Sequence, residues 1–196
     1  MRDVRGYNYG GEGVYTDENV AGVSVIGNAL GNVSGASLYL HCGVDQVVTN
    51  NIVWGNGQPS GPAYHGSGGL VGSCNTGGVD PQYTNISAAV DLNVFLLTEP
   101  GAGLFNNGSL DWRNMTFSRN VYWAAPPLRA DALRWPDAQN AVDRTWAQWQ
   151  AAGQDTAGAL ADPLVASAGA DFTLQPGSPA LALGFQQLDQ TWGPRG

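Results

Sequence analysis

The 196-residue sequence contains no lysine and has few charged residues of any kind. Asp, Glu, Lys and Arg together make up 12% of the chain, and eight basic residues stand against 16 acidic ones, which gives a net charge of −8. A chain without a basic patch cannot displace counterions from phosphates, and an anionic lipid surface does not attract it. The sequence therefore argues against nucleic acid and against a membrane surface as partners.

Long apolar runs are also missing, since no stretch approaches the roughly 20 residues of a membrane span. The first residues, MRDVRGYNYGG, contain no hydrophobic segment of the kind found in a signal peptide. Cysteine is scarce too: Cys42 and Cys74 could form one disulfide or remain thiols, and the sequence favours neither state. Sequons for N-glycosylation give weak support for secretion; they begin at Asn32, Asn85, Asn107 and Asn114.

What the sequence does contain is glycine, 28 residues of it, together with a repeated pattern of short apolar runs. Four segments share one frame, in which alternating apolar residues lead to an asparagine and then to another apolar run. They are GVSVIGNAL, QVVTNNIVW, AAVDLNVFL and NMTFSRNVYW, with Asn28, Asn51, Asn93 and Asn120 at the shared position. The spacing is about 25 residues apart from one longer interval, and such a period is typical of a solenoid.

A second frame recurs between these segments and reads GVYTD, SLYLH and GLFNN. Two short strands per unit, recurring at a nearly fixed period, do not fit a hairpin meander. They fit a coil whose strands pair with the same strands of the next coil, which predicts an all-β, parallel β-helix. The repeated asparagine is expected to stack in a ladder and to satisfy backbone groups.

The sequence divides into coils and a cap. Residues 1–123 are expected to form the β-helix, with a long Gly-, Pro- and Ser-rich loop, or an enlarged coil, at about 57–84. Residues 124–196 are less regular and are expected to close the C-terminal end of the solenoid. A short helix is predicted in DRTWAQWQAAG, with Asp143 as its N-cap and Gly153 as its stop.

The repeated segments resemble the right-handed β-helix repeat proteins of the pectin-lyase-like superfamily, in particular their C-terminal portion. The matching pieces are YGGEGVYTDE, TNNIVWGNG, SRNVYW and the tail WAQWQAAGQD…ADPLV…DFTLQPGSPALALGF. Many members of this group act on carbohydrates. The resemblance therefore implies a right-handed single-stranded solenoid, a polysaccharide or oligosaccharide partner, and a place outside the cell or in the secretory pathway.

The match to this group begins inside a coil. Only Arg2, Asp3 and Val4 stand where the family has a longer strand before YGGEGVY. We therefore expect the chain to be the C-terminal fragment of a longer β-helix protein.

One outward face of the predicted coils gathers residues that could bind a sugar. Because alternate side chains of a strand point to opposite faces, Tyr15 and Asp17 would point outwards from GVYTD. In the same phase, Tyr39 and His41 would follow on the next coil. The predicted substrate-binding residues are Tyr15, Tyr39, Phe105 and Asn107 from these columns, and Glu12 from the GGEG turn.

The candidate catalytic residues are Asp17, Glu18 and His41, as acid, base or nucleophile and as proton carrier. Asp17 and His41 would lie one rung apart, about 4.8 Å, and could form a hydrogen bond. Glycoside hydrolysis uses two carboxyl groups about 5 to 9.5 Å apart. On a regular strand Asp17 and Glu18 would face opposite sides, and only a turn would bring both outwards.

Hydrolysis ranks above polysaccharide lysis, because a lyase usually needs a cation to offset the charge of a uronate and a basic residue to take a proton. This chain has no Lys, few Arg and no clustered cation ligands. No cofactor and no metal site is expected, since His41 and Cys42 are neighbours that face opposite ways. The alternative from a different class is a non-catalytic module that binds glycans or adheres to surfaces, inactive as a fragment. A second exposed carboxylate near Asp17 would favour the enzyme.

Overall fold

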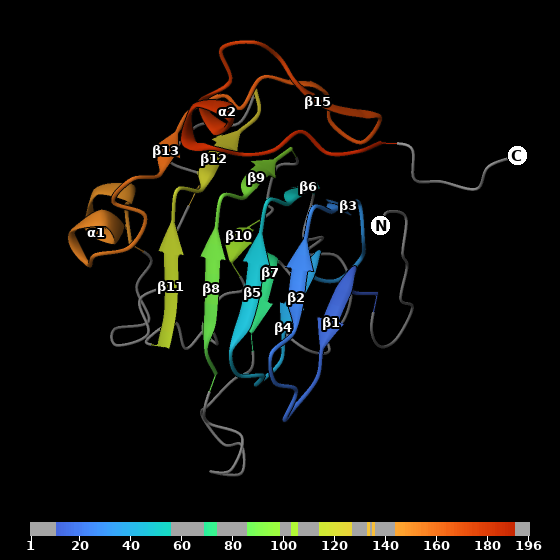
Figure 1. Ribbon diagram of the computed structural model, residues 1–196, viewed down its shortest axis with the longest axis vertical. Helices are drawn as coiled ribbons and strands as arrows, with labels where there is room; N and C mark the ends of the chain where they lie inside the picture. Colours follow the sequence, from blue (N-terminus) through green and yellow to red (C-terminus); the bar gives the residue numbers. More distant parts are fainter. Residues whose placement is uncertain are drawn as a thin grey trace, which may run out of the picture.

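The computed structural model describes residues 11–55, 69–73, 86–98, 103–105, 114–126, 133, 135 and 144–190 (Figure 1). Over these residues the protein is mostly β, with two short helices, α1 (Trp146–Ala151) and α2 (Pro179–Leu183). The strands form three parallel sheets and one antiparallel pair, and within the described ranges none of the sheets closes on itself as a barrel.

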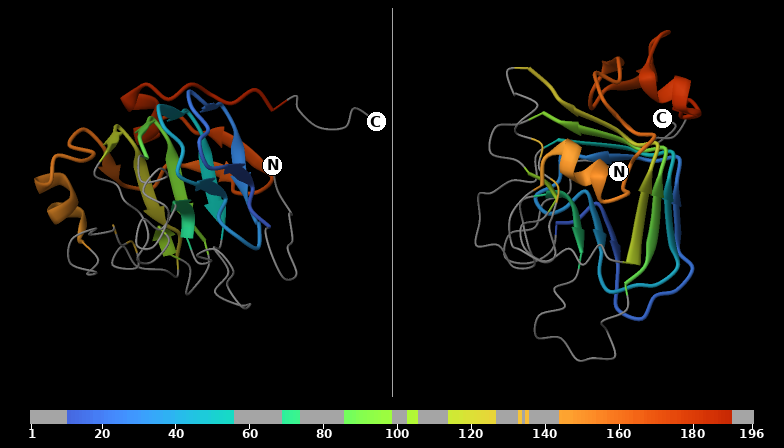
Figure 2. Two further views of the ribbon diagram at one scale, coloured as in Figure 1. Left: turned by 90° about the horizontal axis from the view of Figure 1, so that it is seen from below. Right: turned by 90° about the vertical axis from the view of Figure 1, so that its left-hand side faces the viewer.

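Each parallel sheet takes one strand from every circuit of the chain. The first contains β1 (Val14–Thr16), β4 (Leu38–Leu40), β7 (Gly69–Ser73) and β10 (Gly103–Phe105) in that order. The second contains β2 (Ser24–Ile26), β5 (Gln46–Thr49), β8 (Ala88–Asp91) and β11 (Met115–Ser118). The third contains β3 (Ala29–Gly31), β6 (Ile52–Gly55), β9 (Val94–Leu97), β12 (Val121–Ala124) and β13 (Ala159–Leu160). The chain thus passes through the three sheets in a constant order (Figure 2).

The repeating unit has three strands, where two were expected. The shared asparagine divides each repeated segment into two strands of different sheets, as Asn28 does between β2 and β3. The residue before each of these asparagines has a positive φ: 69° at Gly27, 58° at Asn50, 54° at Leu92 and 51° at Arg119. A single left-handed residue therefore turns the corner, and a pattern of alternating apolar residues does not reveal so short a turn.

A ladder of side-chain amides stabilises this corner, as predicted. Each asparagine donates both its backbone N–H and its Nδ2 to the Oδ1 of the next member, as Asn51 does to Asn93 at 3.0 and 2.9 Å. The Nδ2 of Asn93 also donates to the Val48 carbonyl of the preceding circuit at 2.9 Å. The buried polar groups of the turn are satisfied in this way, which removes the penalty for burying them. The members in order are Asn28, Asn51, Asn93, Asn120 and Asp155.

The ladder ends at Asp155, a fully buried carboxylate. Its Oδ1 accepts the backbone N–H and the Nδ2 of Asn120 at 3.0 and 2.9 Å. Its Oδ2 accepts from the Tyr122 hydroxyl at 2.6 Å and from the Trp149 indole N–H at 3.3 Å. Burial raises the pKa of Asp155, although these donors offset part of the effect. A carboxylate only accepts, so it can take donors from both sides and terminate the ladder.

The C-terminal end of the second sheet is closed by residues next to α1. The Gln154 side chain accepts from the Phe117 N–H at 2.8 Å and donates to the Met115 carbonyl at 3.1 Å. It therefore satisfies the edge strand β11 as another strand would, which protects that edge from pairing with another chain. Thr145 is the N-cap of α1, in a capping box with Gln148. The predicted N-cap, Asp143, lies outside the described residues.

The remainder of the tail was also expected to cover the C-terminal end of the sheets. Instead, it lies along the outer face of the third sheet (Figures 1 and 2). That face is apolar, and the antiparallel pair β14 (Val165–Ser167) and β15 (Asp171–Leu174) and helix α2 pack against it. Phe172 lies on Trp54 with ring centroids 4.6 Å apart. Asn50 and Gln186 exchange two hydrogen bonds of 2.9 and 2.6 Å. The tail thus buries apolar surface that would otherwise face water.

The predicted loop at 57–84 contains a strand. β7 pairs in parallel with β4 on one side and with β10 on the other, so it is a full rung of the first sheet. The rest of that segment, apart from residues 69–73, lies outside the described residues.

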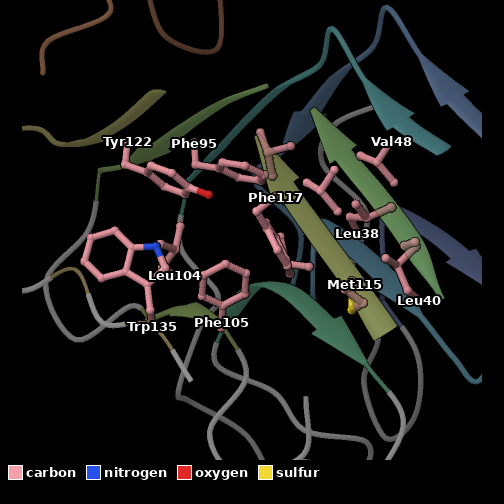
Figure 3. Close-up of a cluster of buried hydrophobic side chains, with 14 of the residues drawn as sticks. Leu38, Leu40, Val48, Phe95, Leu104, Phe105, Met115, Phe117, Tyr122 and Trp135 are labelled. Atoms are coloured by element: carbon pink, nitrogen blue, oxygen red, sulfur yellow. The ribbon is translucent and has the colours of Figure 1, made fainter. Parts of the chain in front are cut away.

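The core fills the space between the three sheets, where apolar side chains stack from rung to rung (Figure 3). Leu38, Leu40 and Phe95 are completely buried, and Phe95 stacks on Tyr122 with centroids 5.1 Å apart. Gln46 departs from this pattern, because it is 2% exposed and neither atom of its amide has a hydrogen-bond partner among the described residues. An unpaired buried amide lowers the stability of the fold.

Replacing Asp155 by Ala is expected to lower the free energy of unfolding by about 3 kcal/mol, because four buried donors lose their acceptor. Urea denaturation followed by tryptophan fluorescence measures this. The exposed Asp162, whose carboxylate accepts one backbone hydrogen bond, provides the matched control. Asp162→Ala is expected to change stability by less than about 1 kcal/mol. Equal effects of the two substitutions would contradict the role given to Asp155.

The contribution of Asp155 is also expected to depend on pH. Since burial raises the pKa of Asp155, its carboxyl group holds a proton more tightly in the folded state than in the unfolded state. The stability difference between the wild-type protein and Asp155→Ala should therefore be largest in acid and should shrink as the pH rises through the raised pKa. Growth of the difference with rising pH would mean that the donors outweigh burial.

Replacing Gln46 by Met is expected to raise the free energy of unfolding by about 1 to 3 kcal/mol, because it removes an unpaired buried amide while keeping a similar volume. The same denaturation experiment measures the gain. A lower stability of Gln46→Met would show that the amide has a partner in solution.

Candidate functional site

Two stacked tyrosines form one side of the candidate site, on the outer face of the first sheet. Tyr15 of β1 is in register with Tyr39 of β4, and their rings stack with centroids 5.2 Å apart and an interplanar angle of 2°. Tyr39 is only 4% exposed, whereas Tyr15 is 39% exposed. The buried ring therefore supports the outer one, which is one of the large hydrophobic side chains that the described surface presents to solvent.

Phe105 does not continue this column, and the prediction that it does is wrong. β10 pairs with β7 so that Phe105 lies opposite Val71, and Val71 lies opposite Leu38. Phe105 is thus in phase with the inward Leu38, one residue away from the phase of Tyr39. It is 5% exposed and packs in the core against Phe117, with centroids 5.8 Å apart (Figure 3). A one-residue shift in register moves a side chain to the other face of a sheet.

A turn directly after β1 brings two carboxylates to one imidazole. β1 ends at Thr16, and the chain turns through Glu18 and Asn19, the latter with a φ of 60°. Asp17 Oδ1 lies 3.2 Å from His41 Nδ1, and Glu18 Oε1 lies 3.9 Å from His41 Nε2. The sequence allowed a turn at this point without predicting one. The turn is present, so Asp17 and Glu18 do not face opposite sides.

Hydrogen bonds connect the stacked tyrosines to this cluster. The Tyr15 hydroxyl lies 3.0 Å from His41 Nδ1 and donates to Asp17 Oδ1 at 3.5 Å. Asp17 also accepts from the Glu18 backbone N–H at 2.8 Å. This N–H and, after it, His41 lower the pKa of Asp17 below its ordinary value. Its side chain is 70% exposed, so the cluster presents an ionised carboxylate to solvent at neutral pH.

The backbone around His41 is held firmly. Its N–H donates to the Thr16 carbonyl at 2.8 Å, which joins β4 to the end of β1. The next residue, Cys42, is disulfide-bonded and 2% exposed, with a φ of 55°. The possible partner named from the sequence, Cys74, lies outside the described residues. The imidazole is 17% exposed, so it contacts solvent while its backbone is fixed on both sides.

The structure brings together five of the predicted site residues: Tyr15, Asp17, Glu18, Tyr39 and His41. Glu12 is half-buried in the turn before β1, beside Gly35, and in the described part of the chain it makes no hydrogen bond to the cluster. Asn107 lies outside the described residues. Sequence reasoning missed the contact of the Tyr15 hydroxyl with His41; the TDEN stretch was the one signal of the turn, since Asn tolerates a left-handed backbone.

Neither similar proteins nor a metal-binding arrangement identifies the role of this cluster. Comparisons with protein-family models, with curated proteins and with solved structures found no match. Over the described residues, no group of three His, Cys, Asp or Glu side chains is arranged to hold a metal ion. The two helices that the structure describes are too short to cross a membrane. The geometry of the cluster therefore carries the functional argument.

The influence of His41 on Asp17 can be measured directly. In His41→Leu, which keeps an apolar body but offers no hydrogen bond, the pKa of Asp17 is expected to rise, yet to stay below its ordinary value because the Glu18 N–H remains. A carbon-detected NMR titration of the carboxyl groups reports this. Asp171 is an internal control, since Thr173 and Gln190 lower its pKa independently of His41. An unchanged Asp17 titration would exclude the contact in solution.

Proposed function

We propose that this protein is a right-handed parallel β-helix that acts on carbohydrates outside the cell, with a hydrolase-like centre at Asp17, Glu18 and His41. Three features support the β-helix: the constant order of the sheets, the parallel pairing of successive circuits, and the amide ladder that runs through them. The disulfide at Cys42 supports an oxidising compartment.

The observation that carries the enzymatic proposal is that two carboxylates contact opposite nitrogens of one histidine. With a single imidazole between them, the carboxyl groups lie no more than about 9.5 Å apart, within the upper limit for glycoside hydrolysis. Asp17 is assigned as the base or nucleophile, because its lowered pKa keeps its carboxylate ionised at neutral pH. His41 carries protons between Asp17 and Glu18, the second carboxyl group and the candidate acid.

The platform for the sugar is Tyr15. Its exposed ring, backed by the parallel ring of Tyr39, offers a flat apolar face on which a pyranose ring packs. The Asp17 carboxylate lies at the hydroxyl edge of that ring, 3.5 Å from the Tyr15 oxygen. A sugar stacked on Tyr15 therefore has its hydroxyl groups beside the acid–base cluster, which is the alignment that catalysis needs.

A second candidate function is glycan binding without catalysis. It is favoured by the Tyr15–Tyr39 stack, which is present whether or not the carboxylates react. The same residues then serve as hydrogen-bond partners for sugar hydroxyls.

Screening of oligosaccharides for hydrolysis decides between the two. For a substrate that is cleaved, Asp17→Asn and Glu18→Gln are each expected to lower kcat by about 10²-fold or more, the range for loss of a general acid or base. Asp162→Asn makes the same charge change elsewhere and should leave kcat unaltered. Undiminished turnover in both site variants would refute catalysis at this cluster, while binding that depends on Tyr15 without any turnover would establish the binding module.

A further inference from the structure

The charge of the site restricts the kind of glycan that it can accept. Asp17 and Glu18 expose 70% and 36% of their side chains around the Tyr15 platform. Within the described residues, the one basic side chain within 4 Å of either carboxylate is His41, at 3.2 Å from Asp17 and 3.9 Å from Glu18. The surface beside Tyr15 is thus acidic, with two carboxylates around one imidazole.

No basic side chain of the described residues is placed to receive an anionic sugar here. Arg119 pairs with Asp91 at the end of the second sheet, through its Nε at 2.9 Å. The whole chain has a net charge of −8 and no lysine. Such a field repels polyuronates during approach and attracts polycations.

The aromatic ring of Tyr15 also favours cations. The face of a tyrosine ring carries a negative potential and attracts ammonium groups as well as sugar C–H groups. The Asp17 carboxylate lies beside the edge of this ring, with its Oδ1 3.5 Å from the Tyr15 hydroxyl. A substituent that projects sideways from a stacked sugar therefore meets a carboxylate, and an ammonium group there gains an ion pair as well as a hydrogen bond.

We propose that the glycan bound at Tyr15 is one whose sugars carry free amino groups, a hexosamine polymer without N-acetyl groups. This proposal rests on the glycan site proposed above and names its substrate class. The amino groups of such a polymer are protonated in mildly acidic solution, so the site recognises it there through Asp17, Glu18 and the ring of Tyr15 together. An N-acetylated polymer keeps the stacking but loses the ion pairs, and a polyuronate also meets like charge.

The test compares three hexamers of equal length: glucosamine, N-acetylglucosamine and galacturonate. Binding is measured by isothermal titration calorimetry at low ionic strength and about pH 6, where amines are protonated and carboxylates are ionised. The glucosamine hexamer is expected to bind about tenfold more tightly than the N-acetylated one, and the galacturonate hexamer should not bind. The preference should shrink at about 0.5 M salt, because exposed charges are then screened.

Variants separate this site from attraction to the acidic chain as a whole. Asp17→Asn and Glu18→Gln are each expected to weaken binding of the glucosamine hexamer by about two- to fivefold without changing binding of the N-acetylated one. Asp162→Asn removes the same charge from the C-terminal segment and should have no such effect. Tyr15→Ala should weaken binding of both hexamers.

Two failures are distinguishable. If the N-acetylated hexamer binds as tightly as the glucosamine hexamer, or if Asp162→Asn weakens binding as much as Asp17→Asn, the substrate class proposed here is wrong while the glycan site stands. If no hexamer binds, or if Tyr15→Ala changes nothing, the glycan site itself is wrong and this proposal falls with it.

Discussion

The hydrogen bonds from one asparagine side chain to the next hold the corner between the second and third sheets, and the rest of the structure depends on that corner. A left-handed residue makes the turn sharp, which buries backbone groups that no strand can satisfy. An amide both donates and accepts, so each rung of the ladder satisfies the one before it and needs the one after it. This directionality explains why the ladder ends in Asp155, since only a carboxylate accepts from Asn120 on one side and from Tyr122 and Trp149 on the other.

The corner also fixes the phase of the strands that carry the site. Because every circuit is anchored at its asparagine, Tyr15 and Tyr39 come into register, and the end of β1 comes beside His41. Along each circuit, the first sheet lies farthest from the anchoring asparagine. Its third strand, β7, belongs to the inserted segment. There the phase differs by one residue, so Phe105 points into the core while Tyr39 points out. Within the described residues, the outward aromatic column of this sheet is therefore two rungs long.

The features that could be predicted from the sequence are those that repeat. The ladder, the parallel strands and the Tyr15–Tyr39 pair follow from spacing, because residues one circuit apart must lie side by side. The corner before each asparagine repeats, but it is one residue long and leaves the apolar alternation unchanged. Single events left no periodic signal, and these are the turn through Glu18 and the strand β7. The position of the tail beyond β13 could not be predicted for another reason, since its apolar residues predict burial without saying whether the end or a face of the sheets receives them.

The most consequential of these single events is the turn after Thr16. Had β1 continued by two residues, Glu18 would share the inward phase of Thr16 and only Asp17 would reach His41. Ending the strand at Thr16 places both carboxylates, one imidazole and one exposed ring together at the edge of a sheet. Acid–base chemistry requires that the two carboxyl groups exchange protons, whereas recognition of a charged sugar requires only negative charge beside Tyr15. The two properties therefore share residues but have separate physical causes, and the acidic character of the site remains even where its chemistry does not operate.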